Sequence, residues 1–219
     1  MSIANLARRA VGRVRSIGWK GHLHLDIRRS MIASHLEQAG HSSVVIVGDS
    51  RVESARLPSE IDGHNVVNAG IGGATIGLVE RVVLPLVENA FCIVIAAGVN
   101  NAKVQPVTEN FEAVLSRACD LSASKAKRIV LTTIPPVLAD APLGVGYYSP
   151  RKICELNRQI RELAQQKGCV TIDLASIMAG PDGNLKPGYS KDGVHLSADG
   201  YTVWTKSLVG GLSEIFRRG

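Results

Sequence analysis

The segment VVIVGDSRVE, from Val44 to Glu53, decides the fold class of this chain of 219 residues. Four apolar residues follow one another without a polar interruption, which is typical of a strand buried on both faces of a parallel sheet. The run ends abruptly in Gly-Asp-Ser. That ending is typical of a strand-to-helix turn in which Asp49 or Ser50 caps the next helix. It also suits the presentation of a serine nucleophile.

The alternation of segments after residue 42 predicts the architecture. Short apolar runs at 43–47, 65–68, 91–97, 128–134 and 169–174 are predicted strands, and segments 75–89, 107–125, 150–167 and 198–216 have helical spacing. Strands that alternate with helices predict a parallel sheet covered on both faces. We therefore expect one three-layer α/β/α sandwich with a five-stranded sheet over residues 43–219. The long irregular connection at 135–149 is typical of a functional loop.

Residues 1–42 form a predicted N-terminal arm with a different charge balance. Residues 1–29 hold seven basic side chains and one acidic one, whereas the rest of the chain carries 18 of each sign. A neutral body argues against a nucleic-acid groove. Apolar residues between 3 and 17 fall on one side of a helical wheel, which predicts an amphipathic basic helix. Two roles stay open for residues 1–20: packing on the domain or on a second subunit, or contact with an anionic membrane.

The cysteines and the hydropathy indicate the compartment. Cys92, Cys119, Cys154 and Cys169 are widely spaced and form no C-x-x-C pair, which favours buried thiols in a reducing environment. No segment approaches the roughly 20 apolar residues of a membrane span, and the N-terminus has no apolar leader. We expect a cytoplasmic protein, with peripheral attachment to an anionic membrane through the arm as the alternative.

The segments that follow the carboxyl ends of the predicted strands carry the groups of an acyl-transfer site. Ligands of open parallel sheets bind beyond the carboxyl ends of the strands. These segments hold GDS at 48–50, NAGIGGAT at 68–75 and GVNN at 98–101, and DGVH at 192–195 follows the last strand.

These four blocks resemble the Ser, Gly, Asn and His blocks of the SGNH hydrolases, also called the GDSL esterase/lipase family, in order and spacing. The resemblance spans residues 44–198 and implies a flavodoxin-like sandwich. It also implies Ser50 as nucleophile, His195 as base and Asp192 as the acid that orients the base. Gly73 and Asn100 would be the oxyanion donors, together with the amide of Ser50.

Elementary chemistry supports these roles. A serine hydroxyl becomes a good nucleophile when a base takes its proton, and an imidazole suits that task near neutral pH. An aspartate three residues before His195 can fold back onto the ring and fix its tautomer. Amides of Ser50 and Gly73 and the carboxamide of Asn100 can converge on an oxyanion from neighbouring strand ends. Without a Cβ, Gly73 lets the backbone approach the substrate closely.

Three other enzyme classes do not fit. The segment GIGGATIG lacks the third glycine of a dinucleotide loop and follows the second strand instead of the first. Ser50 does not lie in a G-x-S-x-G elbow. His22 and His24 have no partner at zinc-site spacing. We therefore expect no metal and no organic cofactor.

Two residues depart from the family pattern. Arg51 replaces the Leu of GDSL, and Asn101 stands where an Asp commonly follows the third-block Asn. Arg51 is expected either to contact an acidic or phosphate-bearing substrate or to point to solvent. Tyr147 and Tyr148, in the long loop, are expected to line the mouth of the site or to cover the sheet edge.

The sequence thus predicts a serine esterase that acts through an acyl-enzyme. The lack of a large insertion favours an open, shallow site and small or short-chain carboxylic esters, with O-acetyl groups as candidates. Two alternatives stay open. One is acyl transfer to a sugar or alcohol acceptor, and the other is a catalytically silent binding module attached through the basic helix. The oligomeric state is not predicted.

Overall fold

A six-stranded sheet forms the centre of the protein. The computed structural model describes residues 3–105 and 107–218, with side chains from residue 21 onward. The strand order is β2-β3-β1-β4-β5-β6. The bounds are β1 Val44–Gly48, β2 Glu60–Ile61, β3 His64–Gly70, β4 Ala90–Ala96, β5 Ala126–Thr132 and β6 Val170–Ile172. All neighbours pair in parallel except β2 and β3, which are antiparallel.

The five parallel strands have the flavodoxin-like order, with the first strand of the chain inside the sheet. The predicted fold class is therefore confirmed, whereas the predicted number of strands is corrected from five to six. The extra strand β2 joins β3 through Asp62 and Gly63, whose φ angles are 47° and 83°. Two consecutive positive φ angles are those of a tight hairpin turn, which Asp-Gly favours.

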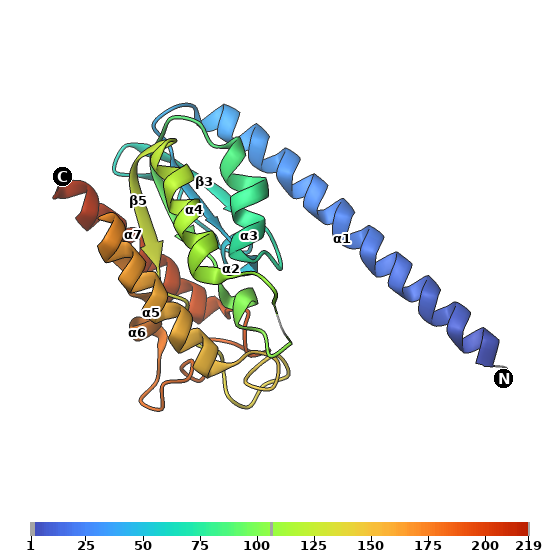
Figure 1. The fold of residues 1–219 in the computed structure, drawn as a ribbon. Coiled ribbons are helices and arrows are strands. Elements are labelled where there is room, and N and C mark those ends of the chain that lie inside the picture. Colours follow the sequence, from blue (N-terminus) through green and yellow to red (C-terminus); the bar gives the residue numbers. More distant parts are fainter. Residues whose placement is uncertain (1–2, 106, 219) are drawn as a thin grey trace.

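Helices cover both faces of the sheet (Figure 1). One layer contains the C-terminal part of α1 (Ile3–Ala39) with α3 Ile76–Leu78, α4 Phe111–Ala123 and α5 Pro150–Lys167, and the other contains α6 Leu174–Met178 and α7 Ala198–Arg217. The strand β1 supplies both layers, because Val45 and Val47 belong to the first core and Val44 and Ile46 to the second. Its unbroken apolar run follows from this burial on both faces.

The predicted helices differ in how well their bounds hold. Helix α5 has the predicted bounds, because the Ser149 hydroxyl caps its start and Gly168, with φ of 66°, ends it. The predicted helix 75–89 is instead three short turns, α3, a π-helical segment η1 (Val79–Val83) and a 3₁₀ turn η2 (Leu84–Leu86). Pro85 lies in η2 and lacks the amide that a continuing α-helix would need.

Helix α1 begins in the predicted arm and ends at the body. In Figure 1 its N-terminal part extends away from the sandwich, and its C-terminal part lies against it. Ile32 is fully buried in the first core, and Leu25 and Leu36 pack beside it. The second half of the arm therefore belongs to the packed structure. The side chains of residues 1–20, on which the predicted basic face depends, lie outside the described part.

The cysteines only partly follow the expected burial. All four are free; Cys92 and Cys119 are buried, Cys169 is partly buried and Cys154 is exposed on α5. Among the helices that the structure describes, none is both long and apolar enough to span a bilayer.

Candidate active site

Ser50 is the first residue of α2 (Ser50–Glu53), directly beyond the carboxyl end of β1. The carboxylate of Asp49 caps this helix by accepting the Arg51 amide at 2.9 Å. Since Ser50 opens the helix, its own amide has no partner within the helix and is free to bind a ligand. Gly48 has no room for a side chain, because a Cβ would collide with Val52. Glycine at this point lets α2 fold back close to the strand.

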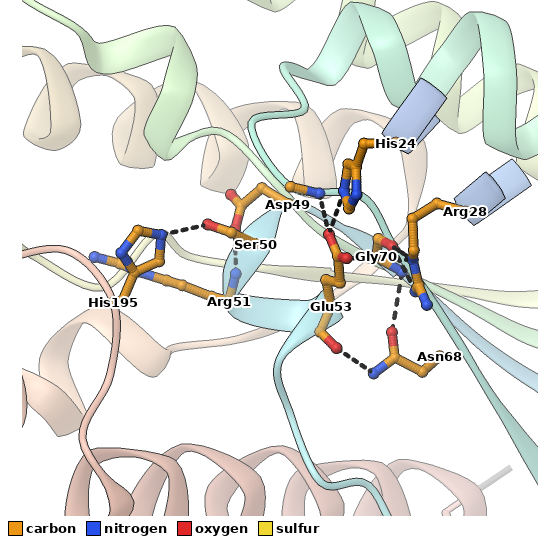
Figure 2. Close-up of polar contacts among 10 residues, drawn as sticks. His24, Arg28, Asp49, Ser50, Arg51, Glu53, Asn68, Gly70 and His195 are labelled. Carbon is orange, nitrogen blue, oxygen red and sulfur yellow. Dashed lines mark hydrogen bonds and ion pairs between the residues drawn. The ribbon is translucent and has the colours of Figure 1, made fainter. Parts of the chain in front are cut away.

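The loop before α7 brings His195 to Ser50 and Asp192 to His195. His195 Nε2 lies 3.1 Å from Ser50 Oγ, and His195 Nδ1 lies 2.6 Å from Asp192 Oδ2. Figure 2 shows the imidazole facing the serine. With Nδ1–H donating to the carboxylate, Nε2 is left to accept the serine proton. The sequence-predicted trio is thus brought into one hydrogen-bonded row.

The Asp192 carboxylate is fixed by its own turn. Its Oδ1 accepts the amides of Val194 and His195 at 3.0 and 2.8 Å. Partial burial raises the pKa of Asp192, but the hydrogen bonds from the His195 ring and these amides outweigh it and hold the pKa below its usual range. The acid is therefore kept ionised beside the imidazole.

The long loop between β5 and α5 braces this turn. The Leu143 amide donates to the Asp192 carbonyl at 2.6 Å, and the Leu138 amide donates to the Gly193 carbonyl at 2.9 Å. A Cβ on Gly193 would meet the main chain of Leu143 and Gly144. The predicted functional loop thus holds the segment that carries the histidine.

Gly73 lies in the loop after β3, which ends beside β1 because Gly48 and Gly70 are register partners. Its φ is 77°, and the space where a Cβ would lie is open. The positive φ therefore explains why this residue is glycine. No neighbouring atom would clash with a side chain at this position.

Asn100 lies in the 3₁₀ turn η3 (Val99–Ala102), after β4. Its Nδ2 donates to the Ala74 carbonyl at 3.1 Å, and its Oδ1 accepts the Tyr148 hydroxyl at 3.3 Å. These contacts fix which end of the amide is the donor, and one N–H of Nδ2 remains for a ligand. The Gly73 loop and the Asn100 turn are thus joined at adjacent strand ends.

The two loop tyrosines have different positions. Tyr148 is buried under Asn100, and burial raises its pKa to about 12, so its hydroxyl stays a donor. Tyr147 is 46% exposed. Tyr148 therefore supports the site from beneath, and only Tyr147 has the exposure expected of a residue at the mouth.

Arg51 does not point to solvent, and that alternative is wrong, because the side chain is only 3% exposed. Its guanidinium donates to the carbonyls of Val194, Pro135 and Pro136 at 2.9, 2.8 and 3.2 Å. Burial lowers the pKa of this guanidinium and raises the pKa of the neighbouring Asp49 carboxyl. Because the side chain is buried and each of its three nitrogens donates to a main-chain carbonyl, we do not assign Arg51 to substrate binding.

Sequence reasoning missed one further set of polar side chains at the site. Figure 2 shows Glu53, His24 and Arg28 on the side of α2 away from His195. Glu53 is close to the nucleophile block in sequence, but His24 and Arg28 come from α1 and carry no local signal of this contact.

A family match identifies the class of protein. The sequence matches the GDSL-like Lipase/Acylhydrolase family over residues 36–203. The chain belongs to this family and is a carboxylic ester hydrolase. No curated protein matches the chain.

Solved structures share the fold at low sequence identity. A protein from Streptococcus pneumonia named for platelet activating factor has 23% identity and a TM-score of 0.80, covering 92% of this chain and 99% of its own. A GDSL-like lipase from Bacteroides thetaiotaomicron has 22% identity and a TM-score of 0.68, covering 85% and 98%. An acetyl-xylooligosaccharide esterase from Geobacillus has 19% identity and a TM-score of 0.59, covering 78% and 94%.

Proposed function

We propose that the chain hydrolyses small or short-chain carboxylic esters with Ser50 as the nucleophile. The observation that carries this proposal is the hydrogen-bonded row from Ser50 Oγ through the His195 ring to the Asp192 carboxylate. A hydroxyl, an imidazole and a carboxylate in this order are the parts of a serine hydrolase.

In the first half-reaction, His195 Nε2 takes the Ser50 proton while Oγ bonds to the ester carbonyl carbon. The carbonyl oxygen then carries the negative charge of the tetrahedral intermediate. The bond to the alcohol breaks, and the imidazolium returns the proton to the leaving oxygen. Asp192 stabilises the imidazolium during this step.

In the second half-reaction, water attacks the acyl-Ser50 ester, with His195 again as the base. The bond between the acyl carbon and Ser50 Oγ then breaks, the imidazolium returns the proton to Oγ, and the carboxylic acid leaves. Both intermediates need donors for the oxyanion, and we assign this role to the amides of Ser50 and Gly73 and to Asn100 Nδ2. Loss of one such donor typically lowers kcat about 10²–10³-fold.

The exposure of the site supports small substrates. Ser50 is only partly buried, and the His195 side chain is 47% exposed. An open site offers little apolar surface for a long acyl chain. O-acetyl groups on larger alcohols therefore fit best, and one structural neighbour is named as an acetyl-xylooligosaccharide esterase.

The test is hydrolysis of p-nitrophenyl acetate, butyrate and octanoate by the wild type and Ser50→Ala, with fluorophosphonate labelling of both. We expect turnover that falls with acyl length and labelling that Ser50→Ala abolishes. Ser54→Ala, one helical turn away, is the matched control and should behave as the wild type.

A folded wild type that is not labelled would contradict the nucleophile and favour a silent binding module. Labelling without turnover would contradict hydrolysis and favour acyl transfer to an acceptor other than water.

A further inference from the structure

The carboxylate of Glu53 reaches the loop that carries Gly73. Glu53 is the last residue of α2, three positions after Ser50, and it accepts the amide of Gly72. The same oxygen, Oε2, lies 3.3 Å from His24 Nε2. Glu53 therefore links α2, which begins with Ser50, to Gly72, the residue directly before Gly73.

Arg28 secures the start of the same loop from α1. Its Nε and Nη2 donate to the Gly70 carbonyl at 3.1 and 2.7 Å, and Nε lies 3.5 Å from Glu53 Oε1. The Arg28 side chain is mostly buried. Figure 2 shows Arg28 and His24 reaching down from α1 to Glu53 and Gly70. One guanidinium thus contacts both the loop and the carboxylate that holds it.

The loop has little freedom between these groups. A Cβ on Gly70 would collide with the main chain of Glu53, and one on Gly72 would lie 3.0 Å from Glu53 Oε2 and 3.4 Å from His24 Nε2. Gly70 and Gly72 are therefore packed against α2 and α1, whereas the next residue, Gly73, borders open space. The packing fixes one side of the loop and leaves the other side to the ligand.

These contacts lie partly outside the family region. His24 and Arg28 precede residue 36, where the family match begins. Helix α1 therefore adds groups to the site that the four family blocks do not contain.

We propose that Glu53 and Arg28 are positioning residues that hold the Gly70–Gly73 loop so that the Gly73 amide can stabilise the oxyanion. This inference rests on the proposed function. Neither side chain touches the reacting atoms. Both act through the main chain of the loop, so their loss should weaken binding of the tetrahedral intermediate more than binding of the ester.

The test compares Glu53→Ala, Glu53→Gln and Arg28→Lys with the wild type. We would measure kcat and KM for p-nitrophenyl acetate, the inhibition constant of a trifluoromethyl ketone that forms a tetrahedral adduct, and the free energy of unfolding. Arg29→Ala is the matched control, because Arg29 is the next residue of α1 and is exposed.

We expect Glu53→Ala to lower kcat about tenfold, which is less than the 10²–10³-fold fall typical of losing an oxyanion donor. KM should change less than about twofold. The inhibition constant of the ketone should rise in parallel with the fall in kcat. Glu53→Gln should restore most of the activity, since its amide oxygen can still accept the Gly72 amide. Arg28→Lys should lower kcat, because an ammonium cannot reproduce the two-pronged contact with the Gly70 carbonyl.

Unchanged kcat and unchanged ketone inhibition in folded Glu53→Ala would overturn the inference while leaving the proposed function intact. If Glu53→Ala does not fold, the same readouts on Arg28→Lys decide. A wild type that turns over no ester contradicts the proposed function, and this inference falls with it.

Discussion

The guanidinium of Arg51 holds the residue that precedes His195, because its Nε donates to the Val194 carbonyl at 2.9 Å. Arg51 follows Ser50 directly, so one side chain joins the segments of the proposed nucleophile and its base. Its other nitrogens donate to Pro135 and Pro136 at the start of the long loop. The cation next to the serine is therefore part of the frame of the site.

Replacing Arg51 with Met should both destabilise the fold and slow catalysis. Three main-chain carbonyls would lose their donor, and a hydrogen bond to a charged group contributes about 1.5–3 kcal/mol. Relief of the buried charge offsets part of these bonds, so we expect a net loss of about 2 kcal/mol or more in the free energy of unfolding. We also expect a lower kcat, because the spacing of Ser50 and His195 is no longer fixed. Urea unfolding and esterase assays measure both. Exposed Arg56 provides the control Arg56→Met, and equal effects of the two variants would contradict the bracing role.

The depressed pKa of Asp192 predicts a pH-dependent contribution to stability. A carboxyl whose folded pKa lies below its unfolded value of about 3.9 stabilises the fold above that pH, and this contribution is lost as pH falls through the folded pKa. The difference in unfolding free energy between wild type and Asp192→Asn should therefore shrink as the pH falls below about 4. Urea titrations from pH 7 to pH 2.5 test this. A difference that does not change with pH would count against an ionised, hydrogen-bonded Asp192.

Gly73 and Gly63 allow backbone strain to be separated from catalysis. Both have positive φ, 77° and 83°, and open space at the Cβ position, but Gly63 lies in the remote hairpin turn. Alanine at either position should lower the free energy of unfolding by a similar amount, roughly 1–2 kcal/mol. Only Gly73→Ala should lower kcat, because only its amide is proposed to bind the oxyanion. Equal kcat for the two variants would remove Gly73 from the oxyanion hole.

Cys169 should be a reactive thiol. The neighbouring Cys119 thiol lowers the pKa of Cys169, burial opposes this, and the Lys167 cation adds to it. Because the thiolate is the reactive form, iodoacetamide should modify Cys169 with a midpoint pH below that of an ordinary cysteine, about 8.5. In Cys119→Ala the midpoint should move upward. Mass spectrometry of digests taken across pH 6–9 measures it, and a midpoint insensitive to Cys119 would rule out the Cys119 thiol as the cause.

The sequence predicted those features that depend on neighbours in the chain. Strands of unbroken apolar residues, the bounds of α5 and the Asp-His turn all have local signals. The edge strand β2 was missed because only two residues pair, although Asp62-Gly63 is a usable hairpin signal. The environments of Arg51 and Arg28 could not be predicted, since their acceptors lie 143 and 42 residues away. Burial of a charged side chain becomes visible only once distant carbonyls are placed around it.

The two outermost strands, β2 and β6, have a consequence for association between copies of the chain. They pair over only two and three residues, so each edge of the sheet offers a short row of free main-chain amides and carbonyls. Short edge strands are one means by which proteins resist edge-to-edge aggregation. The apolar central strands are thus shielded at both sides of the sheet. The protein can therefore keep apolar strands beside the site with little risk that sheets of two copies pair edge to edge.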